Sequence, residues 1–430
     1  MKIARFCCAV ALGAGGLVLT AAATCNMMGT GTPANPTDPT NNTVTLNLVK
    51  LNVQATTAGG PVVGDGVLAF NANGNAILAW LNAGDTQAKV VPAPSGMTHD
   101  SQDFSMQGKK LVVKDRNSGS IYVFDTVTEQ VQAIPSASVN LGTSGKWNAH
   151  GHLVATINAT VTTQDGPNRM IKVTDISNIN AFATTPFDDP TNSPNAISVD
   201  SATGMIAVRG GDSFFIYDVN NPGAPVQTWT LSALQGGFGS TSPIKLSGNF
   251  VAFFDDNDNF SLLNITTGIR TQPGRNPGRP ARGLGLEGIV FAYFATQTAD
   301  DGSTIAVINR AILGNTADVS SVLDPTGAFV NGTDDTDGRI GFGASVGISP
   351  NGRFVFIAGA APVGVSLKDR LYMSTDGGNF LIVADPADPD NALRAAAVGV
   401  SDNLVAFLIP ADLNAAISSN TIGYATLPPP

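Results

Sequence analysis

Four arginines in one short stretch are the residues best placed to do chemistry. Arg270, Arg275, Arg279 and Arg282 fall within 13 residues of a chain that is otherwise acidic. A guanidinium group presents parallel donors to a carboxylate, sulfate or phosphate, so the cluster is a candidate site for an anionic glycan or an acidic partner. The aspartate-rich segment 255–259 is expected at the same end of the fold, and pairing of its carboxylates with the arginines is the structural alternative that we favour.

Aspartate-rich segments also raise the question of calcium, because hard cations take several oxygen ligands. Asp255, Asp256 and Asp258 are weak calcium candidates on this ground. The second such segment, 334–338, lacks the first acidic position and the terminal glutamate of an EF-hand loop. We therefore expect solvated turn aspartates, and neither a committed metal site nor a cofactor.

Three histidines are present, and two of them flank a glycine. His150 and His152 could supply two metal ligands from one side of a strand. The same position in other repeats is filled by Ser247-Gly248-Asn249 and Asn351-Gly352-Arg353, which predicts a turn and not a metal site. His99 lies in a polar connection with no identifiable partner.

Enzyme motifs are mostly absent from the sequence. It contains no GxSxG elbow, no HExxH pair, and no glycine-rich phosphate loop between a strand and a helix. We therefore name no catalytic residue and expect a protein that is not an enzyme. A hydrolase or lyase acting on carbohydrate through paired aspartates stays open as the alternative, since such carboxylates meet in space and not in sequence.

The elements that must hold these residues repeat along the chain. Eight short apolar runs recur 39 to 65 residues apart, each preceded by turn-forming residues and followed by a second apolar run. Six of the eight second runs end in Asp or Asn. The first members of the pairs are VLAF from Val67, LVVK from Leu111, LVAT from Leu153, MIAV from Met205, FVAF from Phe250, IVFA from Ile289, FVFI from Phe354 and LVAF from Leu404.

Units of about 45 residues built from short strands are typical of a β-propeller with four-stranded blades. The eight units predict an all-β protein with eight blades, and seven blades are the alternative. The last unit ends just after its third strand, while the strand Val44–Val53 precedes the first unit without a partner. We expect this N-terminal strand to be the outermost strand of the last blade and to close the ring.

Several units resemble known propeller repeats. The segments Phe214–Leu231 and Leu381–Ala395 resemble LVIVD-type surface repeats, and Ile348–Ala358 resembles the WD-like propeller repeat of exported bacterial proteins. The resemblance implies a propeller scaffold at the bacterial cell surface. It carries over no catalytic residue, because these families share a scaffold and not an activity.

The spacing of the runs predicts which end of the propeller is elaborated. From the second to the third strand, units 1, 2, 4 and 5 take 9 or 10 residues, whereas units 3, 6, 7 and 8 take 18, 16, 27 and 18, with LIVAD from Leu381 as the third strand of unit 7. These connections, and the passage from Gly314 to Gly341, share one end of the blades. Long loops on one end favour a binding face for a protein or polysaccharide, although surface loops also tolerate neutral insertions.

The N-terminus predicts export. Residues 1–24 combine Lys2 and Arg5, an apolar stretch and the run Ala21-Ala22-Ala23, which is the pattern of a secretory signal peptide. Cys25 follows, and residues 25–43 form a Thr/Pro/Asn/Gly-rich tether before the propeller domain at 44–430.

This arrangement resembles a bacterial lipoprotein signal, which implies that Cys25 is lipidated and holds the protein on the cell envelope. The residues before Cys25 depart from the lipoprotein pattern, with Ala22 three positions before it and Thr24 directly before it. Ordinary cleavage near Ala23, giving a periplasmic or secreted protein with a free thiol, is the alternative.

Composition limits the partners. The chain carries 33 acidic and 23 basic residues, a formal net charge of −10 at pH 7, and only 13% charged residues. An acidic surface tells against nucleic-acid binding and against direct adsorption to anionic lipid. We therefore expect a protein or polysaccharide partner at the cell envelope, and a membrane contact through a lipid anchor only.

Overall fold

Strands are the regular elements throughout the part of the chain that the structure describes. This part of the computed structural model comprises residues 43–55, 60–72, 78–85, 87–91, 102–115, 118–135, 139, 141, 145–158, 170–189, 194–230, 244–254, 260–271, 282–288, 290–298, 304–312, 319–322, 345–360, 370–375, 379–385, 388–393, 395, 397–409 and 420–428. All of these residues belong to the unit Pro36–Pro430.

The strands pair into eight sheets, which we number 1 to 8 in chain order. Sheet 1 contains β3 (Val62–Val63), β4 (Val67–Asn71), β5 (Leu78–Asn82) and β6 (Lys89–Val91). Sheet 2 contains β7 (Gln102–Gln107), β8 (Lys110–Asp115), β9 (Ile121–Asp125) and β10 (Val131–Ala133). Sheet 3 contains β11 (Lys146–His150), β12 (Leu153–Ile157), β13 (Ile171–Asp175) and β14 (Ala183–Phe187). Sheet 4 contains β15 (Pro194–Asp200), β16 (Met205–Gly210), β17 (Ser213–Asp218) and β18 (Gln227–Thr230).

The second half of the chain follows the same order. Sheet 5 contains β19 (Lys245–Ser247), β20 (Phe250–Phe254), β21 (Phe260–Asn264) and β22 (Arg270–Thr271). Sheet 6 contains β23 (Arg282–Glu287), β24 (Val290–Thr298), β25 (Thr304–Ile312) and β26 (Val319–Val322). Sheet 7 contains β27 (Ser345–Ile348), β28 (Phe354–Ala360), β29 (Arg370–Thr375), β30 (Leu381–Asp385), β31 (Asp388–Ala392) and β1 (Thr43–Val44). Sheet 8 contains β32 (Ala397–Val400), β33 (Leu404–Ile409), β34 (Asn420–Thr426) and β2 (Leu48–Ala55).

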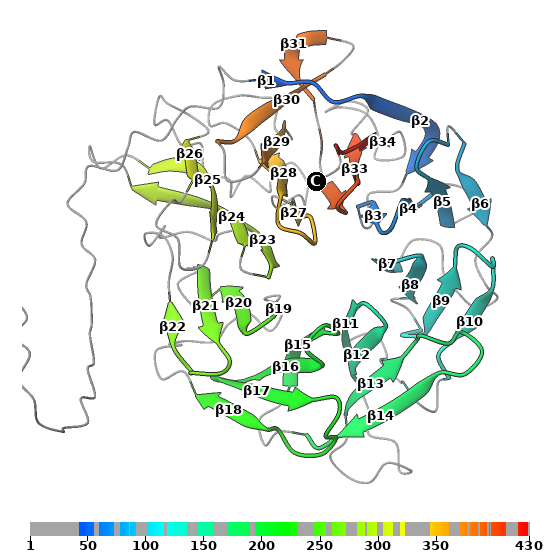
Figure 1. Cartoon of the computed structure of the whole chain (residues 1–430), viewed down its shortest axis with the longest axis vertical. Helices are drawn as coiled ribbons and strands as arrows, with labels where there is room; N and C mark the ends of the chain where they lie inside the picture. Colours follow the sequence, from blue (N-terminus) through cyan, green and yellow to red (C-terminus); the bar gives the residue numbers. More distant parts are fainter. Residues whose placement is uncertain are drawn as a thin grey trace, which may run out of the picture. The chain divides into compact units, whose positions relative to one another are not determined.

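The first strand of each sheet is its innermost strand, and these strands contact one another in a cycle. β3, β7, β11, β15, β19, β23, β27 and β32 each contact the next one, and β32 contacts β3 again. Figure 1 shows the sheets following one another around a centre in chain order. The prediction of an all-β propeller is confirmed.

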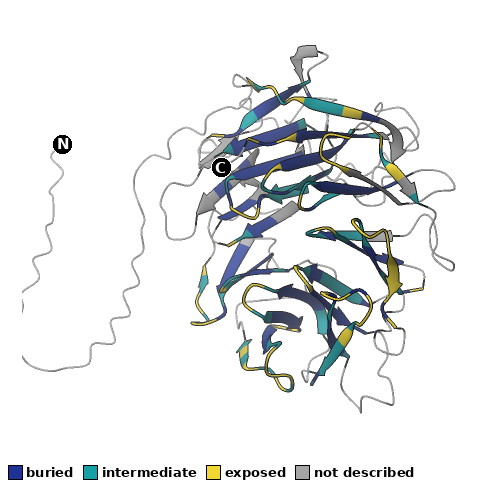
Figure 2. Cartoon of the chain, turned by 45° about the vertical axis from the view of Figure 1, so that its right-hand side comes forward, coloured by how far each residue is buried: buried dark blue, intermediate teal, exposed yellow. Residues whose placement is uncertain are grey.

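The core lies between neighbouring sheets, which explains the continuous apolar runs. In β4, Val67 and Ala69 pack against sheet 2, whereas Leu68 and Phe70 pack against sheet 8. Side chains of a strand alternate between its two faces, so a strand buried on both faces has no polar positions to alternate with. Figure 2 shows the same pattern elsewhere, with buried residues along the strands and exposed ones in many turns.

Aspartate and asparagine at the ends of third strands cap the turns that follow. In four sheets the carboxylate or amide oxygen accepts the N–H of the residue two positions later, which is an Asx turn. The bonds run from Val127 to Asp125 (2.9 Å), Ser177 to Asp175 (2.8 Å), Asn220 to Asp218 (2.9 Å) and Thr266 to Asn264 (2.9 Å). Asp125, Asp175 and Asp218 therefore serve to form turns.

The N-terminal strand pairs with the last sheet, as predicted, but the segment begins one sheet earlier. β2 pairs antiparallel with β34, for example Val49 with Tyr424. Before that, β1 pairs parallel with β30, Thr43 with Ile382. The segment 43–55 therefore connects sheets 7 and 8 at their outer strands, and the Lys50–Asp385 ion pair (3.2 Å) joins the same two sheets.

The assignment of the third strand in unit 7 is wrong. The third strand is β29, which pairs with β28, for example Met373 with Phe356. LIVAD from Leu381 forms β30, the fourth strand. The interval from second to third strand therefore ends at residue 370 and not at 381, and unit 7 has no exceptional insertion there.

The long connection that we expected between the second and third strands of unit 6 is also absent from sheet 6. Its long interval reflects long strands, because β24 and β25 pair over their whole length from Val290↔Ile312 to Thr298↔Thr304. Only 299–303 connects them. The passage that we placed at 314–341 contains β26, so the connection to β27 is 323–344. The long connections between second and third strands are therefore 158–170, 361–369 and 410–419.

Candidate functional site

A row of hydrogen bonds joins the turns between first and second strands of neighbouring sheets, and we call these contacts the turn junctions. At four consecutive junctions, the side chain of the last residue of the innermost strand accepts an N–H from the next sheet's turn. The acceptors are Gln107 from Gly151 (2.6 Å), His150 from Ser201 (2.9 Å), Asp200 from Gly248 (2.8 Å) and Ser247 from Gly288 (2.7 Å).

The row ends where the next turn offers no matching donor. Glu287 occupies the corresponding position on β23, but after β27 the N–H of Ser349 donates to the carbonyl oxygen of Phe354 at 2.9 Å, and Pro350 has no N–H. Glu287 instead lies 3.6 Å from the Lys245 amino group. At the junction of sheets 7 and 8 the direction reverses, since Asp402 accepts the N–H of Asn351 at 2.9 Å.

Between sheets 1 and 2 the turns are joined by a hydrogen bond between backbone groups. Asp65 donates its N–H to the carbonyl oxygen of Gly108 at 3.0 Å. A Cβ atom on Gly64 would lie 1.9 Å from that oxygen, so only glycine permits this approach.

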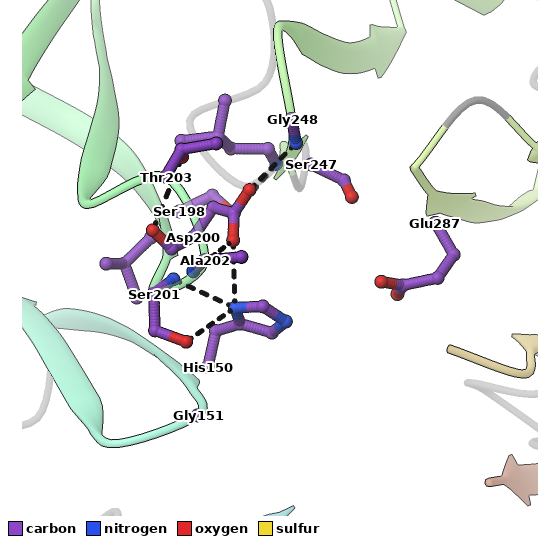
Figure 3. Close-up of polar contacts among 12 residues, drawn as sticks. His150, Gly151, Ser198, Asp200, Ser201, Ala202, Thr203, Ser247, Gly248 and Glu287 are labelled. Carbon is purple, nitrogen blue, oxygen red and sulfur yellow. Dashed lines mark hydrogen bonds and ion pairs between the residues drawn. The ribbon is translucent and has the colours of Figure 1, made fainter. Parts of the chain in front are cut away.

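His150 and Asp200 form the most polar of the turn junctions (Figure 3). His150 Nδ1 lies 3.2 Å from Asp200 Oδ1 and 3.3 Å from the Ser201 hydroxyl. The side chain of Asp200 is 3% exposed, and that of His150 is 36% exposed. Asp200 Oδ1 also accepts the N–H of Ala202 at 2.9 Å, so the carboxylate lies among several donors.

These donors decide the charge of Asp200. Burial alone would raise the pKa of this carboxyl, but the contact with His150 and the N–H groups of Gly248 and Ala202 outweigh burial and lower the pKa to about 2. Asp200 is therefore ionised at neutral pH.

Serine, histidine and aspartate occur together here, but their geometry does not support nucleophilic catalysis. A catalytic triad places the serine and the aspartate on opposite nitrogens of the imidazole. Ser201 and Asp200 both contact Nδ1 of His150. The cluster can hold two sheets together, and it cannot relay a proton from serine to aspartate.

A second layer of contacts lies two residues before the junction residues. Asn148 accepts the N–H of Val199 at 3.0 Å, and Ser198 accepts that of Leu246 at 2.9 Å. At the same position, Gly285, Gly347 and Gly399 leave space that side chains or backbone of the next sheet fill. From sheet 3 to sheet 5 this layer is therefore joined by polar contacts. From sheet 6 to sheet 1 the sheets pack closely at the glycines, and a hydrogen bond from the Val398 N–H to the Ser345 hydroxyl (3.2 Å) joins sheets 7 and 8 as well.

At the other end of sheet 3, Asp189 supports the start of the third strand. It accepts the N–H groups of Met170 (2.6 Å) and Ile171 (3.2 Å), at the end of the long connection 158–170. Burial raises its pKa, and the neighbouring Asp188 adds to this shift.

The arginines of the predicted cluster lie in different elements. Arg270 opens β22, the outermost strand of sheet 5, where its guanidinium donates to Ser261 at 3.0 and 3.3 Å and lies 5.7 Å from the ring of Phe253. Arg282 opens β23, the innermost strand of sheet 6. Arg270 thus contacts its own sheet, while Arg275 and Arg279 lie outside the described residues.

Other predicted residues also fall outside the described part. They are Cys25, His99, the calcium candidates Asp255, Asp256 and Asp258, and the segment 334–338. Within the described residues, no three His, Cys, Asp or Glu side chains are grouped to hold a metal ion. The predicted turn at His150-Gly151-His152 is present between β11 and β12.

Sequence reasoning missed the turn junctions as a set. A signal was available, because the position before each turn holds a polar side chain in five consecutive units: Gln107, His150, Asp200, Ser247 and Glu287. The partner of each of the first four lies in the next repeat, about 40 to 50 residues away, which the sequence alone does not pair.

Comparison with known proteins supports the propeller fold. It gives no information about an activity. No protein-family model matches the sequence, and no curated protein matches it. No helix among the described residues is long and apolar enough to cross a membrane.

Solved structures do match. A chain of the mitotic checkpoint complex has a TM-score of 0.44 and 12% identity over 90% of this chain and 96% of its own. The computationally designed Ika8 protein has a TM-score of 0.54 and 14% identity over 88% of this chain and 99% of its own. At such low identity, the likeness to Ika8 extends to the fold alone.

Proposed function

We propose that this protein is an exported, non-catalytic propeller of eight blades that binds a protein or polysaccharide at the bacterial cell envelope. In this proposal each of the eight sheets is one blade, and segment 43–55 closes the ring. The cyclic contacts of the eight innermost strands and the pairing of β2 with β34 support it. Cys25 carries the lipid anchor, and without lipidation the protein is periplasmic or secreted.

The contrast between the two ends of the sheets carries the binding proposal. Turns between first and second strands are short, the longest being 349–353, and hydrogen bonds join many of them to one another. The other end carries the connections 158–170, 323–344, 361–369 and 410–419. Binding surfaces are commonly built from long loops on a rigid scaffold, so we assign binding to this second end.

Loop replacement tests the assignment. Residues 159–169, 361–369 and 410–419 are replaced one at a time by Gly-Ser linkers of equal length, and each variant is compared with the wild type for retention of components from native cell envelopes. The matched control is Val127→Ser, because Val127 is 64% exposed on a turn at the opposite end. A partner kept by the control and lost by a loop variant supports the proposal.

Two other outcomes would tell against the binding proposal. Retention of the same partners by all three loop variants would contradict a loop-built site. Release of products from envelope polysaccharide, abolished by a single Asp→Asn change, would favour the carbohydrate-active enzyme instead. Replacing Arg275 and Arg279 with serine tests the arginine cluster without disturbing the contacts of Arg270 within sheet 5.

A further inference from the structure

His150 differs from the other acceptors of the turn junctions in one chemical respect. The amide of Gln107 and the hydroxyl of Ser247 accept their N–H at any ordinary pH, whereas histidine changes its charge between pH 5 and pH 8. The atom of His150 that faces Ser201 is Nδ1, and a ring nitrogen accepts a hydrogen bond only while it carries no proton.

The two neighbours of Nδ1 require opposite protonation states of this atom. The N–H of Ser201, at 2.9 Å, needs a lone pair on Nδ1, whereas Asp200 Oδ1, at 3.2 Å, needs a proton there. Both cannot be satisfied in one protonation state. Asp200 Oδ1 also has the N–H of Ala202 at 2.9 Å, so the carboxylate keeps a donor when His150 gives it none.

We propose that His150 is a proton-operated latch between sheets 3 and 4. The neutral ring, protonated at Nε2, accepts the Ser201 N–H and holds the two turns together. When Nδ1 gains a proton, it donates to Asp200 instead, and the Ser201 N–H loses its acceptor. Acidification thus exchanges a hydrogen bond across the junction for an ion pair and loosens the turn 201–204.

Among the described residues, Asp200 is the charged group that faces His150. His152 belongs to the same turn. On sheet 2, Lys110 donates to the carbonyls of Ile176 and Ser177. On sheets 5 and 6, Lys245 and Glu287 pair with each other at 3.6 Å.

Hydrogen exchange of single amides, followed by NMR on the full protein, tests the latch. The protection factor of the Ser201 amide is measured from pH 8 to pH 5, after correction for the intrinsic pH dependence of exchange. The Gly151 and Gly288 amides are internal references, because their acceptors do not titrate in this range. We expect protection of Ser201 to fall about tenfold while the references stay constant.

His150→Gln is the matched variant, since Gln107 already fills the corresponding position with an amide acceptor. In this variant protection of Ser201 should not change with pH. The same fall in the variant, or constant protection in the wild type, would overturn the proposal. Nitrogen-15 shifts of the ring give an independent result, because a neutral His150 protonated at Nδ1 at pH 8 would also overturn it.

Discussion

Replacement of Asp200 by asparagine should remove a defined part of the protein's pH-dependent stability. The carboxylate is 3% exposed and accepts N–H groups from Gly248 at 2.8 Å and from Ala202 at 2.9 Å. Asparagine has nearly the same shape, but it carries no charge and only one of its terminal atoms accepts hydrogen bonds. The change therefore weakens the junction of sheets 4 and 5 without opening a cavity.

The pKa of Asp200 gives the size of the expected loss of stability. The pKa of Asp200 is lowered from 3.8 to about 2, and each unit corresponds to about 1.4 kcal/mol, so ionisation stabilises the folded state by about 2 kcal/mol. Because the folded-state pKa lies below the unfolded one, this contribution is present above pH 4. It is lost as the pH falls from about 4 to about 2.

Urea unfolding of the two proteins between pH 7 and pH 2, followed by tryptophan fluorescence, checks this expectation. Trp147 and Trp229, on sheets 3 and 4, report on this region. Asp200→Asn should be about 2 kcal/mol less stable than the wild type at pH 5, where the proposed contact between His150 and Asp200 is formed, and the difference should close toward pH 2.

Asp218→Asn is the control, because Asn264 already fills the corresponding turn position in sheet 5, and we expect a change within about 0.5 kcal/mol. A difference between wild type and Asp200→Asn that stays constant over this pH range would refute the reasoning. A difference below about 0.5 kcal/mol at pH 5 would refute it as well.

Two further predictions concern the junction of sheets 1 and 2 and the N-terminal cysteine. Gly64→Ala should destabilise the protein by several kcal/mol in urea, because its Cβ would lie 1.9 Å from the Gly108 oxygen, whereas Gly248→Ala, with φ of +55° and no atom within 4 Å, should cost only about 1 kcal/mol; equal losses would show that the close approach is unimportant. Cys25→Ser should abolish incorporation of labelled palmitate and move the protein from the membrane fraction to the soluble fraction, and a native chain that begins with unmodified Cys25 would show that no anchor exists.

The second strands were predictable because their burial is uniform. All residues of β4 and β12 are buried, so these strands appear in the sequence as unbroken apolar runs. Strands buried on both faces carry this signal regardless of what surrounds them. The repeat, the fold class and the pairing partner of the N-terminal strand followed from it.

The fourth strand of sheet 7 was mistaken for a third strand for a physical reason. Fourth strands lie at the outer edge, and β10 and β18 alternate or are exposed accordingly. β30 is different, since β1 pairs along it and its residues Ile382, Val383 and Ala384 are at most 5% exposed. A covered edge strand has the composition of a central one, and the sequence does not show which strand covers it.

The turn junctions show where sequence reasoning reaches its limit. Each acceptor of the row is an ordinary polar residue at the end of a strand in its own repeat, and its partner is a backbone N–H, which has no sequence signature. Only the proline at 350 is informative in advance, because it excludes a donor at one junction. The chemistry of this site therefore depends on the spatial order of the sheets, which the repeats predict, and on contacts between turns, which they do not.

The inner ring combines two ways of joining sheets, and they respond differently to solution conditions. From sheet 3 to sheet 5, Asn148 and Ser198 bond to the backbone of the next sheet. From sheet 6 to sheet 1, Gly285, Gly347 and Gly399 approach valine, isoleucine or backbone of the next sheet. Apolar contacts hardly depend on pH, whereas the polar part contains both His150 and Asp200. Acid should therefore loosen the inner ring most at sheets 3 to 5. Between sheets 7 and 8 it should weaken the contacts of Asp402 with Asn351 and of Asp385 with Lys50, while the close packing at Gly347 persists.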